Sequence, residues 1–233
     1  MKRCSAEEAA ALLRPRDTMI LGFGPAQPGV LLEEVDKRDD REDLTIFGGL
    51  LLQLYPIFAK SGVHLLSGFF GPAERALRDA GHDVAFLPGD FRRFKLFAER
   101  MAARVVAITA PPPDSDGWLS LSLTAGATVE ETLRAGRDPE RLLVVETSPR
   151  LPRTLGLPPE HRHALHVDDV DILIETDRDP RLLGSGPPAS WGQSPAKGAS
   201  VACAFSIFVR VEIVQIFALA FIAHPRMIQP TDS

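Results

Sequence analysis

Cysteine is nearly absent from this 233-residue sequence, which contains only Cys4 and Cys203. The two are far apart, and neither belongs to a Cys-x-x-Cys or Cys/His ligand pattern, so the sequence predicts neither a disulfide framework nor a structural zinc site. Net positive charge is also absent, because 31 acidic residues face 26 Lys and Arg and leave a formal charge of −5. This removes the general electrostatic reason for binding nucleic acid or an anionic membrane surface.

The N-terminus lacks the uncharged apolar stretch of a secretory signal, because Glu7 and Glu8 interrupt it. Together with the scarcity of cysteine, this predicts a cytoplasmic protein. Ser5 and Glu8 have the spacing of a helix capping box. We expect a short helix here, with Leu12 and Leu13 facing inward.

Apolar runs alternate with amphipathic segments along the first 180 residues. The runs that predict strands are 18–21, 44–52, 62–68, 83–88, 103–110, 141–147 and 167–177, and the segments that predict helices are 30–35, 71–81, 90–102 and 127–136. This alternation predicts an α/β domain, with an open, mostly parallel sheet and helices on both faces. The last strand mixes apolar and acidic residues and is expected to be edge-like.

The composition changes at the end of this domain, which we place at 1–180. Residues 181–200 are rich in Pro, Gly and Ser and predict a linker, and residues 201–233 form an apolar tail. Within the tail, 201–223 is long enough to span a membrane, but Arg210 and Glu212 near its centre oppose that reading. One or two apolar strands are the favoured alternative.

Two glycine-containing loops follow predicted strands. The first, "GFGPAQPG" at 22–29, lacks the third glycine of a dinucleotide fingerprint and the Gly-Lys-Ser/Thr of a P-loop. The second is "SGFFGPAER" at 67–75. Each either faces a ligand with backbone N–H groups or serves as a tight turn before a helix.

A third loop, "APPPDSDGWLSLS" at 110–122, ends the strand 103–110. Three prolines fix φ and withhold N–H donors, and the Asp-Ser-Asp-Gly sequence favours a turn. The sequence therefore predicts a rigid corner at the carboxyl end of a strand, where α/β sheets commonly bind ligands.

Other potentially reactive residues form no recognised motif. His161, His163 and His166 are closely spaced, but they follow a proline pair in a polar segment, so a solvated loop is favoured over a metal site. Asp168 and its acidic neighbours are expected to decorate an exposed strand face rather than form an acid/base pair. No Gly-x-Ser-x-Gly elbow occurs. Residue chemistry alone thus predicts no catalytic set and no metal.

Four segments, in this order, carry a family resemblance: 5–35, 62–81, 110–128, and 148–156 together with 166–175. They resemble the N-terminal domain of the acetyl-CoA hydrolase/transferase family, which includes acetate, butyrate and 4-hydroxybutyrate CoA-transferases. The resemblance extends from about Ser5 to Asp177. It implies an acyl-CoA and a small carboxylate as substrates, coenzyme A thioester rather than a bound cofactor, and a role in acetate metabolism.

The resemblance also implies two similar α/β domains with the active site between them. A glutamate of the C-terminal domain attacks the acyl-CoA in this family, and the N-terminal domain forms one wall of the cleft. The residues that correspond to cleft positions are Gly22, Gly24, Pro28, Ser67, Gly71, Pro112, Asp114, Gly117, Ser120, Pro152, Arg153 and Thr154. Arg153 could equally pair with a local acid.

The sequence departs from the family pattern at two of these motifs. The proline corner reads Ala110-Pro111-Pro112-Pro113-Asp114 where the family commonly has Ser-Pro-Pro-Asp, and the turn is followed by Ser120-Leu121-Ser122 where the family has Ser-Leu-Gly. The segment Ser148–Thr154 also differs from the family's Asn-Pro-Asn-Met-Pro-Arg-Thr. No residue here corresponds to the catalytic glutamate, and the last fifty or so residues match nothing expected of the second domain.

Two functions follow from these observations. In the first, the chain is the N-terminal half of an acetyl-CoA hydrolase or CoA-transferase, with a truncated or frame-shifted end and incomplete activity alone. In the second, it is a non-catalytic binding or assembly module that pairs with a separate chain carrying the glutamate domain, with homo-oligomerisation also possible. A membrane-anchored α/β protein is the third and least favoured reading.

Overall fold

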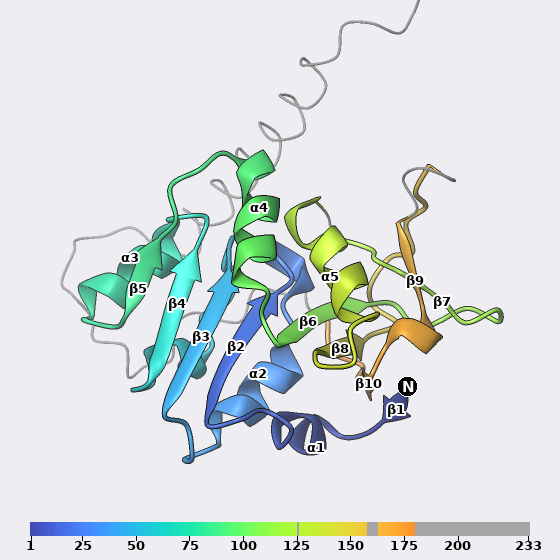
Figure 1. Cartoon of the computed structure of the whole chain (residues 1–233), viewed down its shortest axis with the longest axis horizontal. Coiled ribbons are helices and arrows are strands. Elements are labelled where there is room, and N and C mark those ends of the chain that lie inside the picture. The colour runs from blue at the N-terminus through green and yellow to red at the C-terminus, as the bar shows by residue number, and fades with distance from the viewer. Residues whose placement is uncertain (125, 158–162, 180–233) are drawn as a thin grey trace, which may run out of the picture. The chain divides into compact units, whose positions relative to one another are not determined.

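Ten strands are present in the computed structural model, which describes residues 1–124, 126–157 and 163–179. Their bounds are β1 (Lys2–Arg3), β2 (Arg16–Leu21), β3 (Asp43–Gly48), β4 (Val63–Ser67), β5 (Val84–Phe86), β6 (Val105–Ala110), β7 (Trp118–Ser120), β8 (Leu142–Thr147), β9 (Ala164–His166) and β10 (Ile172–Glu175). Eight of them form one parallel sheet in the order β1-β10-β8-β6-β2-β3-β4-β5, while β7 and β9 pair antiparallel (Figure 1). The predicted α/β fold with an open, mostly parallel sheet is confirmed.

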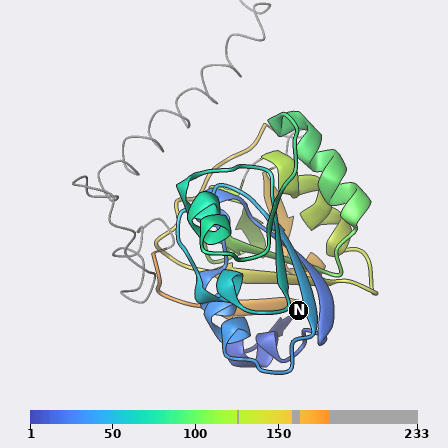
Figure 2. The ribbon, with the colours of Figure 1, turned by 90° about the vertical axis from the view of Figure 1, so that its left-hand side faces the viewer.

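Five α-helices and four 3-10 turns connect these strands. Their bounds are α1 (Ala6–Ala10), α2 (Gly29–Asp36), α3 (Pro72–Asp79), α4 (Phe91–Met101), α5 (Val129–Ala135), η1 (Gly24–Ala26), η2 (Pro56–Ala59), η3 (Gly126–Thr128) and η4 (Val167–Asp169). Helices α4 and α5 cover one face of the sheet, and α1 and α2 lie on the other, as the turned view makes clear (Figure 2). Helices therefore cover both faces, as the sequence predicts.

The two faces of the sheet are set by alternate residues of its strands. In β2, Ile20 belongs to the core beneath α4, whereas Met19 and Leu21 point to the other face. All six residues of β6 are buried, since this central strand is covered on both sides. The unbroken apolar run Val105–Ile108 suits a strand that is covered on both faces.

The strand order reverses between β2 and β6. From β2 the chain proceeds outward through β3, β4 and β5, and it then returns to place β6 on the other side of β2. The loops after these two strands leave the same edge of the sheet in opposite directions. Such a reversal is where open α/β sheets bind their ligands.

Three details differ from the sequence-based expectations. Leu12 is exposed rather than inward-facing, although Leu13 is buried, because α1 ends already at Ala10. The third strand ends at Gly48 rather than continuing to residue 52. Strand β10 is not an edge strand, because β1 pairs with its outer side through the register Lys2 to Ile172.

The described residues belong to one compact unit. The predicted linker 181–200 and apolar tail 201–233, together with His161, lie outside the described residues. Within residues 1–124, 126–157 and 163–179, no helix has the length and apolar character needed to cross a bilayer.

Candidate functional site

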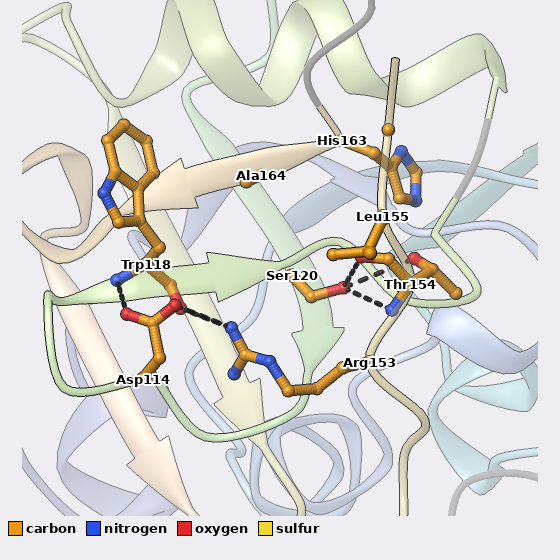
Figure 3. Close-up of a pocket in the computed structure, with 9 residues that line it drawn as sticks. Asp114, Trp118, Ser120, Arg153, Thr154, Leu155, His163 and Ala164 are labelled. Carbon is orange, nitrogen blue, oxygen red and sulfur yellow. Dashed lines mark hydrogen bonds and ion pairs between the residues drawn. The ribbon is translucent and has the colours of Figure 1, made fainter. Parts of the chain in front are cut away.

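Four of the predicted cleft residues line one cavity of about 400 Å³ (Figure 3). They come from the proline corner after β6, from β7, and from the segment that follows β8. The complete lining is Asp114, Trp118, Ser120, Arg153, Thr154, Leu155, Gly156, His163 and Ala164. The cavity therefore joins segments that are more than 30 residues apart in the sequence.

The proline corner is held by the side chain of Asp114. Its Oδ1 accepts hydrogen bonds from the backbone N–H groups of Asp116, at 3.1 Å, and Trp118, at 2.8 Å. This is the local turn geometry that short acidic side chains favour. Gly117 adopts a left-handed φ of 82°, and a Cβ there would lie 2.9 Å from Nε2 of His166. Glycine is therefore required at the turn by both its backbone and its neighbour.

Arg153 fastens this corner to the segment after β8. Its guanidinium donates to the carbonyl of Pro112 at 2.8 Å, to Oδ2 of Asp114 at 3.0 Å and to the carbonyl of Trp118 at 3.0 Å. Because both charged side chains are about 40% exposed, the ion pair alone contributes little stability. The sequence reading in which Arg153 pairs with a local acid is confirmed, and its three acceptors give it a positioning role.

Ser120 connects the floor of the cavity to the same segment. Its hydroxyl donates to the carbonyl of Thr154 and accepts from the N–H of Thr154, both at 2.9 Å. The hydroxyl of Ser122 donates to the carbonyl of Pro152 at 2.6 Å, and that of Thr154 donates to the carbonyl of Ser122 at 3.2 Å. Pro152 and Thr154 are thus held by hydroxyl groups from the end of β7 and the turn after it.

Ser122 occupies a left-handed backbone conformation, with φ at 49°. We expect Ser122→Gly to be more stable than Ser122→Ala by about 1 kcal/mol. Both variants lose the hydrogen bond to Pro152, but only glycine adopts this φ without steric cost. Urea unfolding of the two proteins measures the difference, and equal stabilities would contradict the expectation.

The glycine loop, residues 22–28, lies beside β6. A Cβ at Gly22 would be 2.4 Å from the carbonyl oxygen of Ala26, so the turn closes too tightly for any side chain there. Gly24 has a φ of 58° and donates to the carbonyl of Gly49. The hydroxyl of Thr109, in β6, donates to the carbonyl of Pro25 at 3.3 Å. Pro28 ends the loop as the N-cap residue of α2.

Ser67 and Gly71 belong to a separate polar cluster around Glu74. The buried carboxylate accepts from the Ser67 hydroxyl at 3.1 Å, the Gly71 N–H at 3.1 Å and the Leu51 N–H at 3.4 Å. Burial raises the pKa of Glu74 above its usual value, although these hydrogen bonds act to lower it. Ser67 is completely buried, so this cluster shapes the loops after β3 and β4 from within.

A buried carboxyl group was missed by the sequence reading. Glu146 lies in β8, and its Oε2 accepts hydrogen bonds from the N–H groups of Val30 and Leu31 at the start of α2. Burial raises its pKa to about 7, although the two amides and the charge of Arg178 act to lower it. The available signal was a single acidic residue within the apolar run "RLLVVET".

His163 and His166, two of the three closely spaced histidines, each lie against a backbone carbonyl group. Nε2 of His163 lies 3.0 Å from the carbonyl oxygen of Ser122, and Nε2 of His166 lies 3.1 Å from that of Asp116. Asp171 accepts from the N–H of Leu143 at 2.8 Å. In the part of the chain that the structure describes, no three acidic, Cys or His side chains have an arrangement suited to a metal ion.

The structure thus separates the predicted residues into three groups at the carboxyl edge of the sheet. The first group consists of residues that line the cavity or hold its lining segments in place: Pro112, Asp114, Gly117, Ser120, Pro152, Arg153 and Thr154. The second is the glycine loop with Gly22, Gly24 and Pro28, which contacts β6 through Thr109. The third is the Ser67 and Gly71 cluster, after β4 and farther along the sheet.

Comparison with protein-family models and with curated proteins found no match. Solved structures do match. RipA from Yersinia pestis is 23% identical with a TM-score of 0.62, over 75% of this chain and 42% of RipA. A 4-hydroxybutyrate CoA-transferase from Porphyromonas gingivalis is 20% identical with a TM-score of 0.53, over 76% of this chain and 40% of that protein.

The acyl-CoA transferase YdiF from Escherichia coli is 15% identical with a TM-score of 0.55, over 79% of this chain and 48% of YdiF. At these identities the likeness establishes the fold. The chain spans less than half the length of each of these three proteins. The likeness shows a CoA-transferase-like α/β fold, which matches 40 to 48% of these three proteins.

Proposed function

We propose that this chain forms one wall of the acyl-CoA and carboxylate cleft of an acetyl-CoA hydrolase or acyl-CoA:carboxylate CoA-transferase. The observation that carries the proposal is the cavity formed by Asp114, Ser120, Arg153 and Thr154 at the carboxyl edge of a CoA-transferase-like sheet. These residues come from two of the four segments that carry the family resemblance. The reversal of strand order between β2 and β6 lies at the same edge.

The contribution of the described residues is positional. Arg153 and Asp114 hold the proline corner, and the Ser120 hydroxyl fixes Thr154 beside it. A cleft wall with few conformations lowers the entropy cost of placing a thioester for attack. The wall supplies no nucleophile in this proposal, since the resemblance assigns that role to a glutamate of a second domain.

The proposed reaction is a double displacement on carboxyl carbon. The glutamate oxygen attacks the thioester carbonyl, the C–S bond breaks, and coenzyme A leaves as thiolate with the electron pair. The thiolate then attacks the glutamyl carbonyl of the resulting anhydride and releases the acyl group as carboxylate. An acceptor carboxylate then attacks the glutamyl thioester and expels the thiolate, which attacks the acceptor carbonyl of the new anhydride, so that the acceptor acyl-CoA forms and the glutamate is released. With water as the acceptor, the C–S bond breaks and free glutamate and coenzyme A are released.

The second candidate function is an assembly module that pairs with a separately encoded glutamate domain. The chain covers 40 to 48% of the three solved proteins, and the family resemblance assigns the glutamate to a second domain. Co-expression with such a domain would then restore transfer of coenzyme A between carboxylates. Failure of the two chains to associate would remove this candidate.

Acetyl-CoA titration of the purified full chain tests the wall proposal. We expect saturable NMR shifts at the backbone amides of Trp118, Ser120 and Thr154, and no acetate-dependent thioester exchange by the chain alone. Arg153→Ala should weaken binding about tenfold, which corresponds to about 1.4 kcal/mol, because the corner loses three hydrogen bonds.

Arg150→Ala is the matched control for this titration. Arg150 belongs to the same segment but binds Asp177 and does not line the cavity. We expect its dissociation constant to stay within twofold of the unmodified chain. Absence of saturable binding, or shifts confined to residues outside the cavity, would refute the wall proposal. Rapid thioester exchange by the chain alone would refute the assignment of the catalytic glutamate to a second domain.

A further inference from the structure

Glu146 supplies a hydrogen-bond acceptor that the start of α2 lacks locally. The first N–H groups of a helix have no partner within the helix and are normally satisfied by the N-cap side chain. Here the N-cap residue is Pro28, whose side chain has no acceptor. Oε2 of Glu146 lies 2.9 Å from the nitrogen of Val30 and 3.1 Å from that of Leu31, and thus takes this role from 116 residues away.

The contact of Glu146 with the start of α2 holds the C-terminal end of the glycine loop. At the other end, the Gly22 N–H donates to the carbonyl of Ala107 at 3.0 Å. The Thr109 hydroxyl holds the middle of the loop through the carbonyl of Pro25. Thr109 and Glu146 are direct neighbours in the parallel register of β6 and β8, so their side chains leave the same face of the sheet. Two adjacent strands therefore set where the loop lies.

The titratable groups around Glu146 come from three other segments. Glu33 lies on α2, Arg178 follows β10, and Tyr55 precedes η2. Nη1 of Arg178 is 2.6 Å from Oε1 of Glu33, which forms an ion pair between α2 and the segment after β10. A Cβ at Gly29 would lie 2.6 Å from the Tyr55 hydroxyl, so Tyr55 covers the first turn of α2 closely.

We infer that Glu146 is a positioning residue for the glycine loop, which it holds through two amide bonds, and that the loop opens more readily once Glu146 is ionised, because the closed loop keeps the carboxyl group out of water. Oε2 accepts both amide bonds, which favour the ionised form, so it is burial that opposes ionisation of the closed loop. The inference rests on the proposed function only in treating this loop as part of the cleft. Its hydrogen-bond geometry is independent of any substrate.

The direction of the pH effect follows from burial. Glu146 is only 2% exposed, and burial raises its pKa to about 7 while an opened loop returns it to water. Ionisation is therefore easier in the opened state, and opening becomes more favourable as pH rises toward and through 7. Between pH 5.5 and 8, we expect the opening equilibrium of the first turn of α2 to increase by on the order of tenfold or more.

Amide hydrogen exchange of the full chain tests this inference. Exchange rates at Val30, Leu31 and the loop amides are measured from pH 5.5 to 8 and corrected for the intrinsic pH dependence of exchange. The unmodified chain should show the increase in opening stated above. Glu146→Gln should show none, because glutamine keeps an acceptor oxygen and does not ionise. Glu146→Ala should expose both amides at every pH.

Glu74→Gln is the matched control, since Glu74 is another buried carboxyl group with a raised pKa but binds Ser67, Gly71 and Leu51. It should leave the pH dependence at Val30 and Leu31 unchanged. If Glu146→Ala does not fold, Glu146→Gln still tests whether the pH dependence of exchange comes from this carboxyl group. The inference is overturned if corrected exchange in the unmodified chain does not vary with pH, or if Glu146→Gln retains the variation.

The exchange experiment also separates this inference from the proposed function. If the pH-dependent opening occurs but acetyl-CoA does not bind, the wall proposal fails and the positioning role of Glu146 stands. If acetyl-CoA binds but Glu146→Gln exchanges like the unmodified chain, the wall proposal stands and the inference fails.

Discussion

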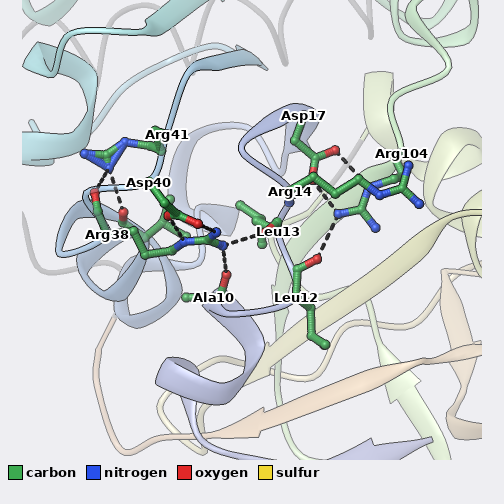
Figure 4. Close-up of polar contacts among 10 residues, drawn as sticks. Ala10, Leu12, Leu13, Arg14, Asp17, Arg38, Asp40, Arg41 and Arg104 are labelled. Atoms are coloured by element: carbon green, nitrogen blue, oxygen red, sulfur yellow. Dashed lines mark hydrogen bonds and ion pairs between the residues drawn. The ribbon is translucent and has the colours of Figure 1, made fainter.

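Replacing Arg104 by alanine is expected to lower the free energy of unfolding by about 3–5 kcal/mol. Arg104 precedes β6, and its guanidinium contacts both carboxylate oxygens of Asp17 at the start of β2 (Figure 4). It also donates to the carbonyl of Leu12 at 3.0 Å. The Asp17 side chain is 1% exposed, so removing Arg104 leaves a buried carboxylate without its counter-ion.

The pH dependence of this pair follows from Asp17. Burial acts to raise its pKa, but the bonds from Arg104 and from the backbone N–H groups of Arg14 and Thr18 outweigh burial and lower it. Because the folded pKa is depressed, the stabilisation is present above the unfolded value and is lost as pH falls through the folded pKa. Arg104→Ala should reduce this acid-dependent contribution.

Urea unfolding at pH 7 and at low pH measures both effects, with Arg16→Ala as control. Arg16 is the first residue of β2 and pairs with Glu42 at 2.7 Å, but both side chains are more than half exposed. Such a pair contributes less than about 1 kcal/mol. A loss of 1 kcal/mol or less in Arg104→Ala would show that the buried pair is not a major source of stability.

Phe94→Ala is expected to destabilise the domain by about 3–5 kcal/mol. Phe94 lies on α4 and is 1% exposed, with its ring centroid 5.2 Å from that of Phe69 and 6.1 Å from that of Phe23. Phe23 belongs to the glycine loop, and Phe69 to the loop after β4. The alanine variant leaves a cavity beneath both loops, which surrounding side chains cannot fill without moving.

The close approach of Phe94 to the backbone limits such relaxation. A Cβ at Gly68 would lie 2.7 Å from the Phe94 ring, so the ring already lies directly against this glycine. Leu96→Ala is the control on the same helix, since Leu96 is 44% exposed and should cost less than about 0.5 kcal/mol. Thermal or urea unfolding compares the two, and similar losses would contradict a core role for Phe94.

Local motifs predicted the turn beside the cavity, whereas the candidates Ser120, Arg153 and Thr154 came from the family resemblance. The proline corner and Gly117 specify a turn through backbone preferences that act within a few residues. The sequence did not reveal that Arg153 donates to the backbone on both sides of Asp114, since those contacts join residues 35 to 41 positions apart. Family resemblance makes Ser67 a cleft candidate, and only the structure shows that its hydroxyl is buried and bonded to Glu74.

The sequence by itself determined the alternation of strands and helices, the glycine and proline turns, and the α/β class of the domain, because hydrophobic periodicity and backbone preference act over short stretches. Only the tertiary structure decided that β1 covers the outer side of β10, that β6 lies beside β2, and that Glu146 caps α2. These features depend on contacts between residues far apart in the chain. Local pattern carries no information on which distant acceptor meets an unpaired amide, so packing of the whole sheet settles that choice.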